Sequence, residues 1–545
     1  MKIALAQINY HIGNFENNFK KISEAIQKAK SEKADLVVFS ELAVSGYPPR
    51  DFLEFDDFIN RCDATIEKIA AECTGIAAIV GSPTRNPEKK GKDLFNTAFF
   101  LEDGKVKSKI SKTLLPNYDI FDEYRYFEPN NKFHFVEFKG KKLAITICED
   151  LWNIGDDLLY RINPMDELYK LEPDIMINIA ASPFDYDQAE KRKSVLLQNV
   201  AKYKLPLIYI NHVGAQTELL FDGGSLAINS KGLITDEMAY FEEDFRIIDI
   251  EDVENKTSIE ERPKPSKISL IHDGLVMGVR NYFEKLGFTK AILGLSGGID
   301  SAVTLVLAVE ALGKENVRSI LLPSRFSSDH SVKDAEDLAK NLGSPYDIIP
   351  IEDAFKSFNG ILGPFFEGLP FNIAEENIQA RTRGVILMAL SNKFGYILLN
   401  TSNKSEAAVG YGTLYGDMNG GLSVIGDVYK TEVFDLARYI NRDKEIIPWN
   451  TITKPPSAEL RPDQKDSDSL PDYDILDEIL YQYIEKRQGP NELIKMGFED
   501  KIVHRILKLV NTNEYKRYQT PPMLRVSPKA FGMGRRMPIV AKYLT

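Results

Sequence analysis

The stretch Ile292-Leu-Gly-Leu-Ser-Gly-Gly-Ile-Asp-Ser-Ala302 determines how the second half of the chain is interpreted. Apolar residues 291–295 predict a strand, two glycines follow it, and residues 302–312 predict an apolar helix that ends at Gly313. A strand, a glycine turn and a helix N-terminus in this order form an anion site, because unpaired N–H groups and the positive end of the helix dipole face the ligand. The stretch therefore predicts a phosphate-binding loop.

An acidic residue distinguishes this loop from the common nucleotide-binding loops. The sequence lacks the lysine of G-x-x-x-x-G-K-[ST] and does not fit G-x-G-x-x-G. Asp300 lies beside the expected phosphate site, where its carboxylate would repel a polyphosphate unless a cation lay between them. The loop therefore implies Mg²⁺ that bridges Asp300 and a polyphosphate. The alternative is a glycine turn in an ordinary α/β protein.

The loop closely resembles SGGxDS, the pyrophosphate-loop motif of the ATP pyrophosphatases. In that superfamily ATP adenylates a carboxylate or carbonyl and pyrophosphate leaves, after which a nitrogen or sulfur nucleophile displaces AMP. The resemblance implies that ATP is contacted along the whole loop, by Gly294, Leu295, Ser296, Gly297, Gly298, Ile299, Asp300 and Ser301.

Length and composition indicate a soluble globular protein with two domains or more. The chain has 545 residues, of which 43% are hydrophobic and 27% charged. A formal net charge of −12 argues against a nucleic-acid partner. Cys62, Cys73 and Cys148 are too few for a disulfide framework and fit a reducing compartment. The sequence shows neither a signal peptide nor an apolar run of membrane-spanning length, so we expect a cytoplasmic protein without a membrane partner.

The two halves of the chain have different patterns of strands and helices. In the first half, short apolar strands, amphipathic helices and two hairpins alternate in a mixed order, which favours an α/β sandwich. Residues 251–267 are charged, contain two prolines and have little apolar content, as is typical of a linker. After it, strands and helices alternate regularly, which predicts a doubly wound parallel sheet. The predicted domains are residues 1–255 and 269–545, joined by a linker at 256–268.

The second half carries further polar segments that suit a nucleotide site. Residues 377–383 open a predicted helix that begins at Asn377, and they place Arg381 and Arg383 two positions apart, so the two arginines point to different anions or, alternatively, are solvated. Three other segments are Thr401-Ser-Asn-Lys-Ser-Glu406 after a predicted strand, the glycine-rich residues 409–426 with Asp417, and a helix that begins at Lys430. The last segment is the proline-rich stretch 454–470, which is expected to form either a lid or an unstructured loop.

Together these segments resemble the NAD synthetases of the same superfamily. The resemblance implies adenylation of the nicotinate carboxylate of deamido-NAD, followed by attack of ammonia. It implies ATP contacts from Ser296, Arg383, Thr401, Lys430 and Ser457, Mg²⁺ ligation by Asp300 and Glu406, and dinucleotide contacts from Asn377, Arg381, Glu406 and Asp417.

The first half offers a source of ammonia at Cys148, which ends the predicted strand of Leu-Ala-Ile-Thr-Ile-Cys-Glu-Asp-Leu-Trp152. Glu149 and Asp150 would raise the pKa of this thiol, so its thiolate needs a base and a cation nearby. Glu41 and Lys112 follow other predicted strands and are the candidates. The residue pattern alone does not bring them together, and an inert buried cysteine is the alternative.

In their contexts, Glu41, Lys112 and Cys148 resemble the Glu-Lys-Cys triad of the nitrilase superfamily, and Glu41-Leu-Ala-Val-Ser-Gly-Tyr-Pro48 resembles its glutamine-hydrolysing branch. The resemblance implies that Cys148 attacks the glutamine amide, Glu41 acts as general base and acid, and Lys112 stabilises the oxyanion. Glu123 resembles a second glutamate beside the triad. The implied glutamine contacts are Tyr118, Glu149, Ser182 and Gln188. Gln188 lies near the position at which some members of the family carry a basic residue.

The two halves together resemble the glutamine-dependent NAD synthetases. The implied fold is an α/β arrangement in which a nitrilase-like αββα sandwich precedes a doubly wound parallel-sheet domain, similar to the adenine nucleotide alpha-hydrolases. The implied enzyme is a homo-oligomer that carries out the last step of NAD biosynthesis, converting deamido-NAD, ATP and L-glutamine into NAD, AMP, pyrophosphate and L-glutamate with channelled ammonia. Three alternatives are a tRNA-modifying ATP pyrophosphatase with an accessory amidase domain, a non-catalytic nucleotide-binding protein, and an amide ligase with another acceptor.

Overall fold

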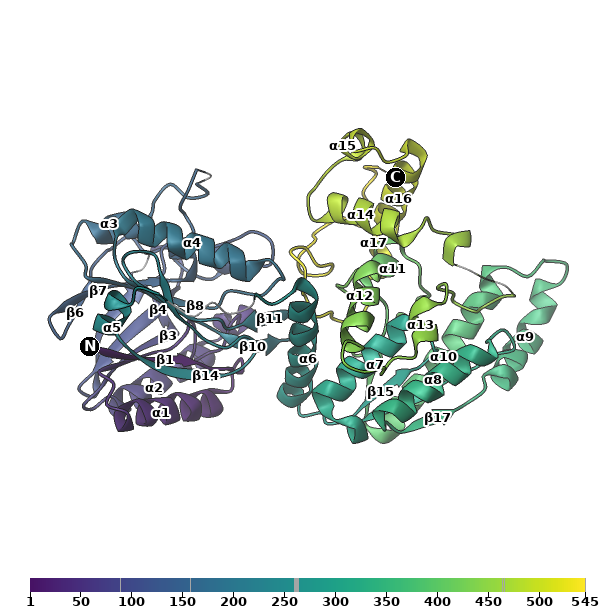
Figure 1. Cartoon of the computed structure of the whole chain (residues 1–545), viewed down its shortest axis with the longest axis horizontal. Helices are drawn as coiled ribbons and strands as arrows, with labels where there is room; N and C mark the ends of the chain where they lie inside the picture. The colour runs from purple at the N-terminus through teal and green to yellow at the C-terminus, as the bar shows by residue number, and fades with distance from the viewer. Residues whose placement is uncertain (89, 157, 259–263, 463, 465, 545) are drawn as a thin grey trace. The chain divides into compact units, whose positions relative to one another are not determined.

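The computed structural model describes residues 1–88, 90–156, 158–258, 264–462, 464 and 466–544. The chain forms two compact units, Met1–Lys264 and Pro265–Thr545 (Figure 1). Helix α5 (Ile250–Asn255) ends where the predicted linker at 256–268 begins, and α6 (Lys267–Leu286) includes the last two residues of that linker. Residues 259–263 fall outside the described part of the chain.

The first unit contains two six-stranded sheets. In the first sheet β1, β2 and β3 are parallel to one another, and in the second sheet β7, β8 and β9 are parallel. The first sheet has the order β14 (Asp244–Asp249), β1 (Lys2–Gln7), β2 (Leu36–Val38), β3 (Ala77–Arg85), β4 (Leu94–Glu102) and β5 (Lys105–Ser111). The second has the order β13 (Ile234–Glu237), β12 (Leu226–Ile228), β9 (Leu207–Asn211), β8 (Ile175–Ala180), β7 (Lys141–Ile147) and β6 (Val136–Phe138), and a separate hairpin pairs β10 (Val213–Gln216) with β11 (Leu219–Asp222).

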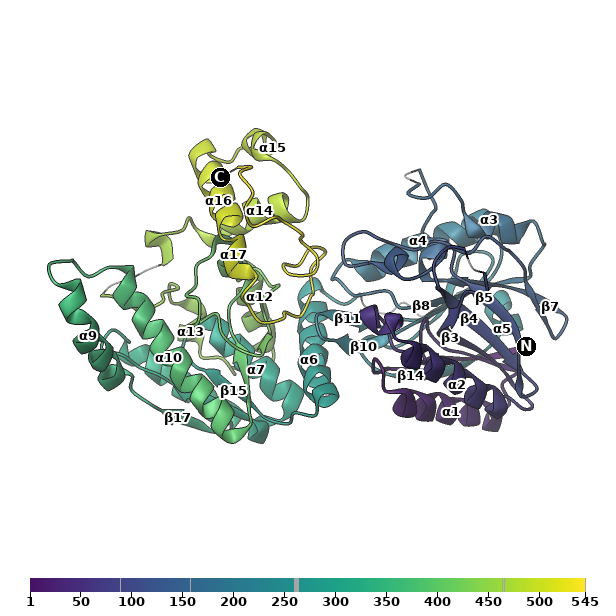
Figure 2. The same cartoon turned by 180° about the vertical axis from the view of Figure 1, so that it is seen from behind.

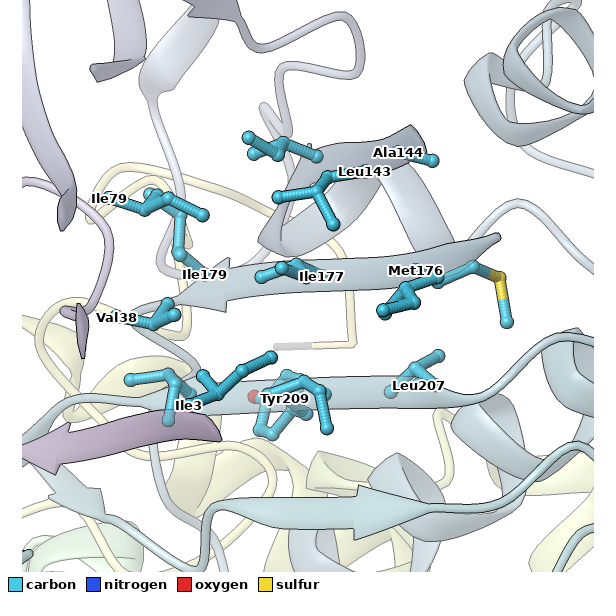
Figure 3. Close-up of a cluster of buried hydrophobic side chains, with 14 of the residues drawn as sticks. Ile3, Val38, Ile79, Leu143, Ala144, Met176, Ile177, Ile179, Leu207 and Tyr209 are labelled. Atoms are coloured by element: carbon cyan, nitrogen blue, oxygen red, sulfur yellow. The ribbon is translucent and has the colours of Figure 1, made fainter. Parts of the chain in front are cut away.

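The core of this unit lies between its two sheets. Apolar side chains such as Ile3 and Ile79 on one sheet meet Ile177 and Ile179 on the other (Figure 3). The outer faces are covered by helices, so the central strands are buried on both sides; every residue of β8, for example, is buried. Helices α1 (Phe15–Ser31) and α2 (Asp56–Glu72) pack on the first sheet, and α3 (Pro164–Tyr169) and α4 (Gln188–Tyr203) lie over the second (Figure 1). This arrangement confirms the predicted αββα sandwich.

The second unit is built on a five-stranded parallel sheet in the order β17-β16-β15-β18-β19. Helices α7 and α8 pack on one face and α10 on the other (Figures 1 and 2), which confirms the predicted doubly wound sheet. The strand order reverses between β15 and β18, and ligands bind at the carboxyl ends of the strands beside such a point. The bounds are β15 (Ala291–Gly294), α7 (Ile299–Leu312), β16 (Val317–Leu321), α8 (Asp329–Leu342), β17 (Tyr346–Ile348), α9 (Glu352–Phe366), α10 (Ile373–Phe394), β18 (Ile397–Asn400) and β19 (Leu422–Ser423).

Two helices begin earlier than the sequence pattern indicated. Helix α7 starts at Ile299 instead of residue 302, so the last residues of the phosphate loop form its first turn. Helix α10 starts at Ile373, and Asn377 therefore lies in its second turn instead of opening it. The cause is a capping box, in which the side chains of Asn372 and Glu375 satisfy the free N–H groups of the helix start.

The rest of the second unit is mostly helical, and its last four helices had not been predicted. Apolar residues of α11, α14, α15 and α16 form a separate small core. Among the described residues, every helix is too short or too polar to cross a membrane. The remaining bounds are α11 (Lys404–Val409), α12 (Lys430–Ile440), α13 (Trp449–Thr453), α14 (Tyr473–Ile484), α15 (Pro490–Lys495), α16 (Asp500–Thr512) and α17 (Glu514–Arg517).

Candidate active sites

In the first unit, Lys112 lies between two glutamates from distant parts of the chain. Its Nζ donates to Glu41 Oε1 at 2.7 Å and to Glu123 Oε1 at 2.9 Å. The side chains of Lys112 and Glu41 are fully buried, and that of Glu123 is nearly so. Buried charges are retained in proteins when they are paired and hydrogen-bonded. The fold thus brings Glu41 and Lys112 into direct contact.

The carboxylate of Glu41 is held at both oxygens. Asn96 Nδ2 donates to Oε1 at 2.7 Å, and the backbone N–H of Ala181 donates to Oε2 at 2.9 Å. Together with the bond from Lys112, these contacts fix the orientation of the carboxylate. A general base in a fixed orientation can accept a proton from a nucleophile without first reorganising.

Cys148 directly follows strand β7 and begins a short 3₁₀ helix, Cys148–Leu151. Its φ of 42° lies in the left-handed region, which is costly for a residue with a side chain and is frequent at active sites. Asp150 supports this turn: its Oδ1 accepts the N–H groups of Thr113 and Leu114 at 3.0 and 2.8 Å, and its Oδ2 accepts that of Ile147 at 3.1 Å. Asp150 therefore ties the cysteine turn to the segment that follows Lys112.

The electrostatics of this cluster keep the lysine charged and the thiol protonated. Burial acts to lower the pKa of Lys112, but the Glu123 and Glu41 carboxylates outweigh it and raise this pKa well above its usual value. Burial, with help from Glu41, raises the pKa of the Cys148 thiol, and the charge of Lys112 opposes this only in part. Burial also raises the pKa of Glu123 to about 7. A thiol of this kind needs a base to become nucleophilic.

The residues expected to bind glutamine form two small groups. Glu149 Oε1 accepts hydrogen bonds from Tyr118 at 2.8 Å and from Tyr160, which is not among the predicted site residues, at 3.1 Å. Ser182 Oγ accepts a hydrogen bond from Gln188 Nε2 at 3.4 Å. Tyr160 lies in a connection without motif or periodicity, so its sequence gives no signal for a role at this site.

In the second unit, the phosphate loop adopts a conformation that requires glycine. Gly297 has a φ of 82°, and a Cβ atom there would lie 2.1 Å from the carbonyl oxygen of Ser331. Gly298 caps helix α7, and its N–H donates to Ser296 Oγ, which lies 3.1 Å from Ser301 Oγ. The loop therefore presents backbone N–H groups and hydroxyls at the N-terminus of α7, which suits a polyphosphate.

Two acids and one lysine meet beside this loop. Lys430 Nζ lies 2.5 Å from Asp300 Oδ2 and 3.5 Å from Glu406 Oε1, and Asn403 Nδ2 donates to Asp300 Oδ1 at 2.8 Å. Burial, with help from Asp300, raises the pKa of Glu406 to about 8. Two carboxylates share the single ammonium of Lys430, and this arrangement favours binding of a further cation.

The donor set fits Mg²⁺ that is shared with a substrate. The described residues contain no group of three or more His, Cys, Asp or Glu side chains arranged around one metal position. Mg²⁺ commonly binds to one or two carboxylates, together with phosphate oxygens and water. Asp300 and Glu406 supply two carboxylates next to the expected phosphate position.

A cavity of about 310 Å³ opens over the loop, a size within the range of small-molecule sites. Of the predicted nucleotide-site residues, Gly297, Asn377 and Arg381 do not line it. Asn377 Oδ1 instead accepts a hydrogen bond from Thr413 Oγ1 at 2.8 Å, and Arg381 Nε donates to the carbonyl of Leu414 at 3.2 Å, so both contact the glycine-rich segment. The lining includes Gly294, Leu295, Ser296, Gly298, Ile299, Asp300, Ser301, Arg383, Thr401, Glu406, Asp417, Lys430 and Ser457.

Two further acids at this cavity were missed. Glu459, in the proline-rich stretch, accepts hydrogen bonds from the Ser328 and Ser331 hydroxyls at 2.8 Å, and so connects this stretch to the residue behind Gly297. Asp466 lines the cavity and accepts a hydrogen bond from Tyr473 at 2.9 Å. The only sequence signal was the presence of acids in a proline-rich stretch, and the fold alone shows that the stretch packs against the site.

Comparisons with known proteins match both halves of the chain. The carbon-nitrogen hydrolase family model matches residues 2–255, and the NAD synthase family model matches residues 271–520. Proteins named glutamine-dependent NAD(+) synthetase are similar over almost the whole length. The one from Synechocystis sp. is 45% identical over 99% of this chain and 99% of its own, and the one from Thermotoga maritima is 40% identical over 100% and 99%.

Solved structures of proteins with the same name are also similar over almost the whole chain. The chain is similar to the glutamine-dependent NAD+ synthetase from Acinetobacter baumannii in complex with ADP, with 39% identity, a TM-score of 0.78, and coverage of 99% of this chain and 98% of that one. The corresponding protein from Cytophaga hutchinsonii shares the fold at 22% identity, with a TM-score of 0.85 and the same coverage.

Proposed function

This chain belongs to the glutamine-dependent NAD(+) synthetase family, and on that premise we propose that it transfers the amide nitrogen of L-glutamine to deamido-NAD while ATP is cleaved to AMP and pyrophosphate. The observation that carries the glutamine-dependent half of this proposal is the buried Glu41–Lys112 pair in the unit that holds Cys148. The family match favours this reaction over the tRNA-modifying alternative.

In the glutaminase step, Cys148 attacks the side-chain amide carbon of glutamine. Glu41 takes the thiol proton, and the ammonium of Lys112 stabilises the negative oxygen of the tetrahedral intermediate. Glu41 then gives its proton to the leaving nitrogen, the C–N bond breaks, and ammonia and a γ-glutamyl thioester form. Water activated by Glu41 hydrolyses the thioester to L-glutamate and restores the thiol. Glu123 keeps Lys112 charged throughout.

In the synthetase step, the loop at residues 294–301 holds the phosphates of ATP. The carboxylate of deamido-NAD attacks the α-phosphorus, pyrophosphate leaves, and ammonia then displaces AMP from the adenylate. Lys430 lies where it offsets the charge of the phosphates. Arg383 lines the same cavity, and burial lowers its pKa to about 10, so its guanidinium remains charged at neutral pH.

Asp300 and Glu406 would hold Mg²⁺, which when bound neutralises charge on the polyphosphate. Such charge neutralisation makes pyrophosphate a better leaving group. Lys430 contacts both of these acids, and Asn403 keeps Asp300 oriented through its 2.8 Å hydrogen bond.

We infer that the enzyme is a cytoplasmic homo-oligomer. Exposed apolar side chains on α9 and α10, the residues of this surface, support self-association, because exposed apolar residues that gather in a patch mark interaction sites. All three cysteines are free, which fits a reducing compartment. The exposed apolar residues of this surface are Phe358, Ile361, Phe365, Ile373, Val385 and Met388.

The proposed reaction is tested by its stoichiometry. Wild-type protein with deamido-NAD, ATP, Mg²⁺ and L-glutamine is expected to form NAD, AMP and pyrophosphate in equal amounts, with at least one glutamate per NAD. Failure to form NAD from either glutamine or ammonium chloride would mean that the acceptor is a different molecule.

A further inference from the structure

Two phenols, from Tyr118 and Tyr160, converge on a single carboxylate oxygen in the glutaminase unit. Both hydroxyls donate to Oε1 of Glu149, at 2.8 and 3.1 Å. Hydrogen bonds to a charged acceptor are stronger than neutral ones, and two donors on one oxygen restrict rotation of the carboxylate. Glu149 is therefore fixed by two residues from separate segments of the chain.

The backbone of Tyr160 is itself fixed by a buried amide. Asn153 Oδ1 accepts the N–H of Tyr160 at 3.1 Å, and Asn153 Nδ2 donates to its carbonyl at 2.9 Å. Asn163 Nδ2 in turn donates to the carbonyl of Asn153 at 3.0 Å. Both backbone polar groups of Tyr160 are thus bound to one side chain, so its phenol reaches Glu149 from a defined position.

Glu149 is buried and forms no ion pair within the described part of the chain. Glu149 is only 5% exposed, and none of the described lysine or arginine residues forms an ion pair with its carboxylate. A buried carboxylate without an ion pair is costly, and burial raises the pKa of Glu149, which the hydrogen bonds from the two tyrosines and the charge of Lys112 oppose only in part. Glutamine, in contrast to simpler amides, brings a cation in its α-ammonium group.

The position of Glu149 suits this partner. It directly follows the nucleophile Cys148, so the two Cα atoms lie about 3.8 Å apart and their side chains can engage the two ends of one amino acid. We propose that Tyr160 is a specificity-determining residue for glutamine: with Tyr118 it holds the Glu149 orientation that accepts the α-ammonium. This inference rests on the proposed glutaminase function of Cys148.

The test compares L-glutamine with glutaramate, the same amide without the α-amine, in wild type, Tyr160→Phe and Tyr203→Phe. The last variant is a matched control, because Tyr203 also donates to a carboxylate, Asp166, at 2.7 Å, but lies outside the site. The loss of one charge-assisted hydrogen bond predicts that Tyr160→Phe lowers kcat/KM for glutamine about tenfold, through KM. Glutaramate should change less than about twofold, since it offers no cation to Glu149.

Two outcomes would overturn the proposed role of Tyr160. An equal loss for both substrates would show that Tyr160 is merely structural, and no loss for glutamine would show that Tyr118 suffices; either result overturns the proposal. If glutaramate turns over too slowly, its Ki against glutamine hydrolysis replaces kcat/KM. Failure of the proposed function is distinguished by Cys148→Ala: a variant that still hydrolyses glutamine removes the catalytic premise, whatever Tyr160→Phe does.

Discussion

The ammonium of Lys430 lies 2.5 Å from Asp300 Oδ2, although 130 residues separate the two. Lys430 is the first residue of α12, and Asp300 lies in the first turn of α7. Asn403, the N-cap of α11, also donates to Asp300. Three helix N-termini therefore meet at this acid, and their dipoles together with Lys430 make the region favourable for a polyphosphate.

Replacing Lys430 by Met should abolish the ligase reaction and spare the glutaminase. Loss of one charged group at the phosphates is expected to reduce NAD formation about 10²–10³-fold, with glutamine or with ammonium. Glutamine hydrolysis without the other substrates should remain at the wild-type rate. Wild-type NAD formation in this variant would show that Lys430 only balances the two acids.

Gly297→Ala should destroy the phosphate loop, whereas Gly287→Ala should not. Both glycines have positive φ, at 82° and 77°, so both substitutions carry the same backbone penalty of about 1 kcal/mol. Only at Gly297 would the new Cβ also meet backbone, 2.1 Å from the Ser331 carbonyl oxygen, while nothing lies within 4 Å at Gly287. The predicted result is loss of ATP binding by calorimetry in Gly297→Ala alone. Equal ATP affinities in the two variants would contradict this account of the loop.

Removal of the buried Lys404 should be strongly destabilising. Its Nζ lies 3.0 Å from Asp427 and 2.9 Å from Glu485, and all three side chains are almost fully buried. Lys404→Met would remove the ammonium that lies between these two buried carboxylates, at a cost of about 3–5 kcal/mol in unfolding free energy. Lys333→Met, which breaks an exposed pair with Asp337, should change it by less than about 1 kcal/mol. Denaturant titration of both variants distinguishes the two cases.

The His272 ring should contribute stability that is lost at high pH. Burial acts to lower its pKa, but hydrogen bonds to Asp273 and Glu310 raise it from 6.5 to about 9. A base with a raised native pKa stabilises fully below pH 6.5 and loses this contribution as the pH rises through about 9. Because both acids are partly exposed, we expect only about 1–2 kcal/mol.

The measurement for His272 is the unfolding free energy of wild type and His272→Gln at pH 6 and pH 10. The difference between the two proteins should be largest at pH 6 and should shrink at pH 10. His504→Gln is the control, since His504 forms an exposed pair with Asp500. A difference that stays constant between the two pH values would show that packing of the ring, and not its charge, links α6 to α7.

The sequence predicted those parts of the fold that depend on local pattern. The apolar residues 291–295 and the glycines after them specified β15 and the loop, and alternation of strands and helices specified the parallel sheet. The early start of α10 could also have been found, because Asn372 and Glu375 form a capping box that is visible in the sequence. The same holds for α16, whose buried Val503, Ile506, Leu507 and Val510 recur at helical spacing.

Contacts between distant residues could not be predicted from local pattern. Glu41 and Lys112 are 71 residues apart, and their segments follow β2 and β5, which the pairing of β2 with β3, β3 with β4 and β4 with β5 places in one sheet. Their joint role was available from family resemblance alone. Tyr160 lacked even that signal, because its position depends on two backbone hydrogen bonds with the Asn153 side chain and not on any periodicity.

Cys148 is proposed to supply ammonia to a separate ligase site, and NAD formation by Cys148→Ala tests this division of labour. Wild type and variant receive deamido-NAD, ATP and Mg²⁺ with either L-glutamine or ammonium chloride. We expect that the variant forms no NAD with glutamine and forms it at the wild-type rate with ammonium. NAD formation with glutamine at the wild-type rate would show that Cys148 is structural and that the nitrogen comes from another site.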